Sequence, residues 1–264
     1  MKSICLNCLV YTLKDKEVKD NMYLEILYVW LGKVIQSGGL TENDLLQIII
    51  DSRTYQYLEN NDNVLSILLD KLPCSFTMVI VDPPANSLQG MMNKYSITDY
   101  SQDIFIYSDI DILISNPFSN LIDMLEPKSY YFCKEGYLEE ENYSGSLSSQ
   151  ITDPNLPGFS AGKFIITDKE LRDSFFKQIQ AMCDYSTKFY TVEQPFFNHA
   201  IYSLPRDTVS VNIDLLAEYV SFNGNDEYDK NKTIFNDMAG DVGNGDAHIK
   251  KIMTAMSLYL TGFY

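Results

Sequence analysis

The chain has 264 residues, of which 45% are hydrophobic and 13% aromatic, a composition typical of a packed globular protein rather than a disordered chain. Its 36 acidic side chains against 20 basic ones give a formal net charge of -16. Because this charge repels a phosphate backbone and anionic lipid headgroups, it argues against nucleic acid as a partner.

The first part of the chain alternates between predicted strands and predicted helices, which is typical of an α/β sheet. Apolar runs predict strands over residues 4–12, 46–50 and 76–81. Apolar residues at helical spacing predict helices over residues 21–36, 55–71 and 87–100, and glycines follow the first of them. A central strand then begins near residue 103.

The second part continues the alternation with shorter elements. We expect helices over residues 118–125, 169–183, 195–202 and 250–260, and strands over residues 130–134, 164–167 and 233–235. Asp168 is a plausible N-cap of the second of these helices. Residues 135–158 predict a long polar loop, either a lid or acceptor loop or ordinary surface. No internal repeat or linker is visible, so we expect one domain over residues 1–264.

The five cysteines are an odd number in mostly apolar surroundings, which favours reduced thiols in a cytoplasmic protein. Cys5 and Cys8 are three residues apart on a predicted strand, so they face opposite ways, and no second pair completes a zinc site. The sequence shows no signal peptide and no apolar stretch approaching 18 residues. We therefore expect no transmembrane segment.

Two carboxylates, Asp109 and Asp111, interrupt the apolar run over residues 103–115. Residues i and i+2 of a strand share a face, so the two acids would repel each other unless a cation lies between them. Magnesium or manganese, held by one or two carboxylates and by phosphate oxygens, is the expected partner. The alternative is a solvated turn rich in aspartate, which the apolar flanks on both sides disfavour.

The segment Tyr107-Ser108-Asp109-Ile110-Asp111 resembles that of nucleotide-sugar glycosyltransferases with a Rossmann-like GT-A fold, especially the retaining group that includes glycogenin and bacterial galactosyltransferases. Three later segments are similar to that family's motifs and follow in the family's order. They are Ser160-Ala161-Gly162, Glu193-Gln194 and the C-terminal run Asn236…Gly243…His248-Ile249-Lys250. The resemblance thus implies a single-domain α/β GT-A fold, with a mostly parallel sheet flanked by helices and a small acceptor-side sheet.

The resemblance implies a metal site at which Asp109 and Asp111 hold Mn²⁺ or Mg²⁺ against the diphosphate of a nucleotide sugar. The third ligand stays open between His248 and Asn236. If Asn236 is the ligand, His248 or Lys250 faces the diphosphate instead. The segment that contains Gly243 and Lys250 closes over the metal and the diphosphate in this family.

The resemblance also assigns substrate contacts. Glu193 and Gln194 would lie beside the anomeric carbon, contact sugar hydroxyls and stabilise an oxocarbenium-like transition state. Glu193 stands where the family has Asp, and Ser160 where it has Asn, so the donor sugar stays open. Substrate-binding roles fall to Val10, Tyr11 and Thr12 at the nucleoside, Lys94 on the phosphate side, Ser108 beside the acids, and Ser160, Ala161, Gly162, Gly243 and Lys250.

We therefore expect a metal-dependent glycosyltransferase that moves a sugar, with UDP as the expected carrier, to a hydroxyl of a glycan, protein or small molecule. Retention of configuration rests on the family analogy. One alternative is a haloacid-dehalogenase-like phosphatase, which also carries Asp-x-Asp after a strand, although Leu113 stands where such enzymes have Thr or Val. The other alternative is an inactive transferase fold that binds a sugar or a partner.

Overall fold

The computed structural model describes residues 2–61, 63–145, 153, 155–189, 191–205, 209–222 and 231–238. Within them, seven strands form a main sheet and three form a second sheet. In spatial order the main sheet contains β3 (Ser75–Val81), β2 (Leu45–Asp51), β1 (Ile4–Val10), β4 (Ile104–Ser108), β7 (Pro157–Ile166), β6 (Ser129–Tyr137) and β8 (Ser210–Asn212). The second sheet contains β5 (Ile112–Ile114), β10 (Phe235–Asp237) and β9 (Val220–Phe222).

The main sheet is mostly parallel, as expected. β1 pairs in parallel with both β2 and β4, and β3 pairs in parallel with β2, whereas β7 runs antiparallel to β4 and β6. The chain moves outward from β1 to β2 and β3, and then returns to place β4 on the other side of β1. Ligands of open α/β sheets bind at the carboxyl ends of the strands at such a switch in strand order.

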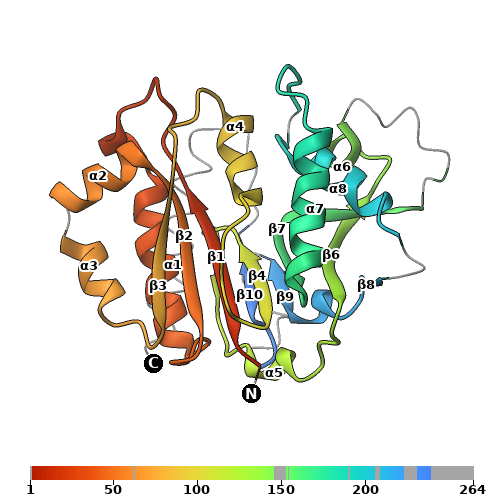
Figure 1. Ribbon diagram of the computed structural model, residues 1–264, viewed down its shortest axis with the longest axis horizontal. Coiled ribbons are helices and arrows are strands. Elements are labelled where there is room, and N and C mark those ends of the chain that lie inside the picture. Colours follow the sequence, from red (N-terminus) through yellow and green to blue (C-terminus); the bar gives the residue numbers. More distant parts are fainter. Residues whose placement is uncertain are drawn as a thin grey trace.

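Helices cover both faces of the main sheet (Figure 1). The helices are α1 (Tyr23–Ser37), α2 (Ser52–Asn61), α3 (Asn63–Leu69), α4 (Ser87–Met92), α5 (Ser119–Ile122), α6 (Glu141–Ser144), α7 (Lys169–Met182) and α8 (Gln194–Tyr202). Residues of α1, α2, α3 and α5 share one buried apolar cluster with the second sheet, and residues of α4, α7 and α8 belong to another. β1 serves both, since its alternate side chains Cys8 and Leu9 enter opposite clusters.

Several predicted boundaries are confirmed closely, including β2, β3 and α7. The Asp168 carboxylate accepts a hydrogen bond from the backbone N–H of Leu171 at 2.9 Å, so the predicted N-cap is confirmed. All five cysteines are free, and Cys5 and Cys8 are buried. None of the described helices is long and apolar enough to cross a membrane.

The helix predicted over residues 87–100 is wrong after Met92. A 3-10 turn follows over Asn93–Tyr95, and the next residues are not helical. Arg172 donates to the carbonyl oxygen of Thr98 at 2.7 Å, and the Gln47 side chain donates to that of Asp99 at 2.9 Å. These carbonyls are therefore bonded to distant side chains instead of to a helical backbone.

Other predicted elements differ in extent. The single helix predicted over residues 55–71 is divided into α2 and α3. Residues 135–158 are not wholly a loop, because β6 continues to Tyr137 and α6 follows, while the strand predicted to begin at residue 164 already begins at Pro157. The short strand predicted over residues 233–235 lies at Phe235–Asp237. The helix predicted over residues 250–260 lies outside the described residues.

Candidate active site

Asp109 and Asp111 lie on a turn between the two sheets, not within one strand as predicted. β4 ends at Ser108 in the main sheet, and β5 begins at Ile112 in the second sheet. The backbone N–H of Ile112 donates to the Asp109 carbonyl at 3.0 Å and closes the turn. We call residues 109–112 the acidic turn. Its two carboxylates lie at the carboxyl end of β4, next to the switch in strand order.

The Asp109 carboxylate is mostly buried at the wall of the cleft, with 24% of its side chain exposed. Its Oδ1 accepts a hydrogen bond from the Tyr107 hydroxyl at 2.6 Å and lies 3.4 Å from Lys94 Nζ. Burial raises the pKa of Asp109 to about 6; Lys94 lowers it, while Asp111 and Glu193 raise it further. The negative charge at this turn thus exceeds what the neighbouring ammonium offsets, and a cation would stabilise it.

Lys94 lies behind the carboxylates and does not line the cleft. Its side chain is fully buried, and its Nζ lies 2.7 Å from Glu193 Oε1 and 3.3 Å from the Ala161 carbonyl oxygen. Burial lowers the pKa of Lys94, but Asp109 and Glu193 outweigh this effect, so its pKa is raised overall. Lys94 is therefore an ammonium that joins Asp109 to Glu193, a position different from the phosphate contact that the resemblance implied.

A cleft of about 830 Å³ opens in front of the acidic turn and contains most of the predicted site residues. Its lining includes Val10, Tyr11 and Thr12 after β1, Asp109 and Asp111, Ser160, Ala161 and Gly162 of β7, and Glu193 and Gln194 at α8. Ser108 does not line it, because its hydroxyl donates to the carbonyl oxygens of Asp109 and Ile112. Gly243, His248 and Lys250 lie outside the described residues.

Tyr11 forms the nucleoside end of the predicted site. Its ring packs on Gly90 of α4 so closely that a Cβ at this glycine would lie 2.3 Å from the ring. Asn21 donates to the Tyr11 carbonyl at 3.0 Å and to the Thr12 hydroxyl at 2.8 Å. One aromatic wall of the cleft is therefore fixed from two sides, in a form on which a base could stack.

Gln194 connects two walls of the cleft. Its Oε1 accepts from the Ala161 backbone N–H at 3.1 Å, and its Nε2 donates to the Asn142 carbonyl at 3.0 Å. Asn198, one turn later in α8, bonds both the N–H and the carbonyl of Phe159. The start of α8, and with it Glu193, is therefore held rigidly against β7.

On β10 the structure separates the predicted ligand Asn236 from its neighbour. Asn236 is buried, does not line the cleft, and its Oδ1 has no hydrogen-bond partner within the described part of the chain. Asp237 lines the cleft instead, and its Oδ2 lies 2.5 Å from Nζ of the buried Lys163, which also pairs with Glu135. Sequence analysis missed these three charged residues. Successive residues of a strand face opposite ways, but β10 has only three residues, too few for the sequence to show which of residues 236 and 237 faces the cleft.

The acidic turn fits a hard divalent cation whose ligands come partly from the protein and partly from a phosphate. Among the described residues, no three His, Cys, Asp or Glu side chains come together as a metal-binding group. Two carboxylates suffice for Mg²⁺ or Mn²⁺ where substrate phosphates supply further oxygens. The residues present therefore suit a cation that binds together with a diphosphate.

No protein-family model matches the chain, and no curated protein does. Solved structures do match over nearly its whole length. The apo bifunctional glycosyltransferase WbbM has a TM-score of 0.58 at 15% identity over 98% of this chain, and the apo glycosyltransferase GlyE of Streptococcus pneumoniae TIGR4 has 0.52 at 12% over 99%. The galactosyltransferase LgtC, solved with donor and acceptor sugar analogues, has 0.54 at 14% over 97%.

These matches identify the fold of the chain as GT-A, as the resemblance implied. The chain spans 51% of WbbM and 62% of GlyE, but 95% of LgtC. The matches concern the arrangement of the two sheets and the helices.

Proposed function

We propose that this protein is a metal-dependent glycosyltransferase that moves a sugar from a nucleoside diphosphate, expected to be UDP, to a hydroxyl acceptor. The observation that carries the proposal is the acidic turn, which places two carboxylates at the cleft of a GT-A fold. The net charge of -16 supports it as well, since a diphosphate in this protein needs a local cation.

In this proposal the donor lies along the cleft from Tyr11 to Glu193. The base stacks on Tyr11, the diphosphate lies at the acidic turn, and the sugar reaches Glu193. Asp109 and Asp111 would hold the cation, with His248 as the candidate third ligand outside the described residues and Asp237 as the carboxylate that β10 presents to the cleft. A bound Mn²⁺ or Mg²⁺ would offset the charge that develops on the departing diphosphate.

The chain's own residues would act on the sugar. Lys94 holds Glu193 in place through their 2.7 Å ion pair. A carboxylate held there can accept hydrogen bonds from sugar hydroxyls and stabilise positive charge at the anomeric carbon. The side-chain amide of Gln194 is hydrogen-bonded to the backbone groups of Ala161 and Asn142, so it holds the adjacent wall of the cleft in position. Retention of configuration stays an analogy with the resembling family.

No observation favours the phosphatase alternative. Its nucleophile would be Asp109, but Oδ1 of this residue is bonded to Tyr107 and close to Lys94, and the matched structures carry the GT-A fold. The inactive binding module remains an outcome of the experiment below.

The proposal is tested by incubating the purified protein with Mn²⁺ and a panel of nucleotide sugars, and measuring release of the nucleoside diphosphate with and without chelator. We expect chelator-sensitive release from one donor, increased by a suitable acceptor. Metal-dependent UDP binding without release from any donor would favour the inactive module. Absence of nucleotide binding under all conditions would contradict the proposal.

A further inference from the structure

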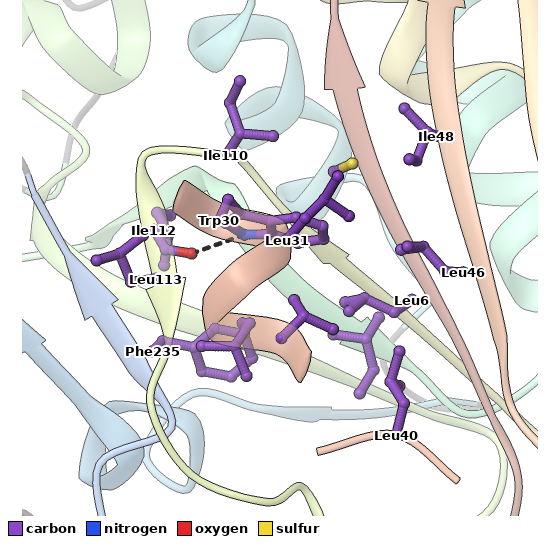
Figure 2. Packing of buried hydrophobic residues seen from close by; sticks show 14 of the residues in the cluster. Leu6, Trp30, Leu31, Leu40, Leu46, Ile48, Ile110, Ile112, Leu113 and Phe235 are labelled. Carbon is purple, nitrogen blue, oxygen red and sulfur yellow. Dashed lines mark hydrogen bonds between the residues drawn. The ribbon is translucent and has the colours of Figure 1, made fainter. Parts of the chain in front are cut away.

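Trp30, the only tryptophan of the chain, lies beneath the acidic turn. It belongs to α1, is fully buried, and donates a hydrogen bond from its indole Nε1 to the carbonyl oxygen of Ile112 at 3.0 Å. Figure 2 shows the indole pointing from α1 to the start of β5, across the buried cluster. The bonded carbonyl belongs to the residue directly after Asp111.

Two backbone bonds from elsewhere in the fold hold the first and third residues of the turn: the Asp109 N–H donates to the Gly162 carbonyl of β7 at 2.8 Å, and the Met238 N–H donates to the Asp111 carbonyl at 3.2 Å. Trp30 holds the carbonyl of the last residue, Ile112. Ser108 donates to the same Ile112 carbonyl at 3.3 Å, and the Ile112 N–H closes the turn to Asp109 at 3.0 Å. Both of these bonds lie within the segment 108–112. Trp30 is a side-chain partner of this carbonyl from another element, so together with the bonds to Gly162 and Met238 it fixes where the turn lies relative to the rest of the molecule.

The same helix also supports the aromatic wall of the cleft, which Tyr11 forms. Residues Met22 and Tyr23 at its start line the cleft, and Asn21 just before it bonds Tyr11 and Thr12. Helix α1 therefore connects the aromatic wall at one end with the acidic turn, which Trp30 contacts about two turns further along. A nucleoside diphosphate bound along the cleft would contact both regions, the base at Tyr11 and the diphosphate at the acidic turn, so the distance between the two regions has to stay constant.

We propose that Trp30 is a positioning residue, which holds Asp109 and Asp111 through the Ile112 carbonyl in the arrangement that receives a cation and a diphosphate. The inference rests on the proposed function for the identity of the ligands. It does not give Trp30 a contact with substrate, because the indole is buried and does not line the cleft.

The test compares Trp30→Phe and Ser108→Ala with the matched control Tyr131→Phe. Trp30→Phe and Ser108→Ala each remove one hydrogen-bond donor to the Ile112 carbonyl. Tyr131, also buried in this cluster, accepts a hydrogen bond from the Glu126 N–H at 2.6 Å outside the cleft lining, so Tyr131→Phe removes a comparable buried bond elsewhere. Two quantities are measured for each protein: the exchange rate of the Ile112 amide hydrogen and the affinity for Mn²⁺ with UDP.

We expect Trp30→Phe to accelerate exchange of the Ile112 amide and to weaken Mn²⁺–UDP binding about tenfold, and Ser108→Ala to do the same to a smaller extent. Tyr131→Phe should leave the affinity for Mn²⁺ with UDP unchanged. It should change the Ile112 exchange rate only as much as its loss of global stability explains. If Trp30→Phe fails to fold, Ser108→Ala and the protection of the single indole N–H of the unaltered protein still decide.

Unchanged Ile112 exchange, or unchanged Mn²⁺–UDP affinity in a folded Trp30→Phe protein, would overturn the inference. So would an equal loss of affinity in Tyr131→Phe. Failure of the unaltered protein to bind Mn²⁺ or UDP would contradict the proposed function instead, and the exchange rates would still show whether Trp30 fixes the turn.

Discussion

Lys94 offsets part of the negative charge of the candidate site. One buried ammonium faces two carboxylates, Asp109 and Glu193, and no part of its side chain reaches solvent. Such an arrangement is costly to break, because removing the ammonium leaves the buried Glu193 and the mostly buried Asp109 without their cation.

Replacing Lys94 with methionine should therefore lower the free energy of unfolding by about 3–5 kcal/mol, measured by urea denaturation. The matched control is Lys169→Met, which removes a surface ion pair with Asp99 whose side chains are 43% and 98% exposed. That control should cost at most about 1 kcal/mol. Equal losses in the two variants would contradict the role given to Lys94.

Asp111 provides the most direct residue-level test of the metal proposal. Asp111→Asn keeps the size of the side chain and removes its charge, so metal-dependent UDP affinity should fall by at least about 10–100-fold with the fold retained. Asp109→Asn should act in the same direction. Calorimetric titration of UDP with Mn²⁺ measures both.

The control for these variants is Asp103→Asn. Asp103 precedes the same strand at its other end, where its carboxylate bonds the backbone N–H of Ser3 in an exposed position. It should bind UDP and Mn²⁺ as the unaltered protein does. Wild-type affinity in Asp111→Asn would remove the metal site from the account.

At the scale of elements, two close contacts of glycines shape the cleft walls. A Cβ at Gly162 of β7 would lie 2.9 Å from Asp109 Oδ2, and a Cβ at Gly90 of α4 would lie 2.3 Å from the Tyr11 ring. The first contact determines how β7 approaches the acidic turn. The second determines how α4 approaches the aromatic wall at Tyr11.

Gly162→Ala and Gly90→Ala should therefore have different effects, although each adds one methyl group. Both should weaken UDP binding in the presence of Mn²⁺, by about tenfold if the displacement costs about 1.4 kcal/mol. Only Gly162→Ala should weaken Mn²⁺ binding measured without nucleotide, for example by electron paramagnetic resonance. The reverse pattern would show that the two walls have been assigned incorrectly.

The elements also show where sequence reasoning succeeded and failed. Buried runs such as Leu46 to Ile50 are strands because parallel strands covered on both faces are apolar throughout, and this pattern is visible in the sequence. The change of sheet between Ser108 and Ile112 is not visible, because both flanks are apolar strands and pairing decides which sheet each joins. The acids were therefore found, but not the turn that presents them.

Long-range ion pairs were likewise beyond the sequence. Lys163 lies in an apolar strand segment, and only the fold brings it to Glu135 and Asp237, 28 and 74 residues away. β10 is three residues long, too short for a periodic pattern, so the resemblance alone pointed to Asn236 and Asp237 was not identified. The resemblance supplied Glu193 and Gln194, whereas the roles of Lys94 and Trp30 required coordinates.

At the scale of the whole molecule, the net charge of -16 implies that a bound diphosphate would need a local cation, as the proposed function requires. A ligand that binds only the folded state stabilises it by about 2.7 kcal/mol at a hundred times its dissociation constant. We expect UDP with Mn²⁺ to raise the melting temperature accordingly. UDP with chelator should leave it unchanged, and an equal rise with chelator would contradict cation dependence.

The most direct test of the central claim is an anomalous difference map from crystals grown with Mn²⁺ and UDP. The account predicts a manganese peak about 2.1 Å from carboxylate oxygens of both Asp109 and Asp111 and from the diphosphate, with the base against Tyr11. A nucleotide bound without a metal peak at the acidic turn, or a metal bound elsewhere in the cleft, would contradict it.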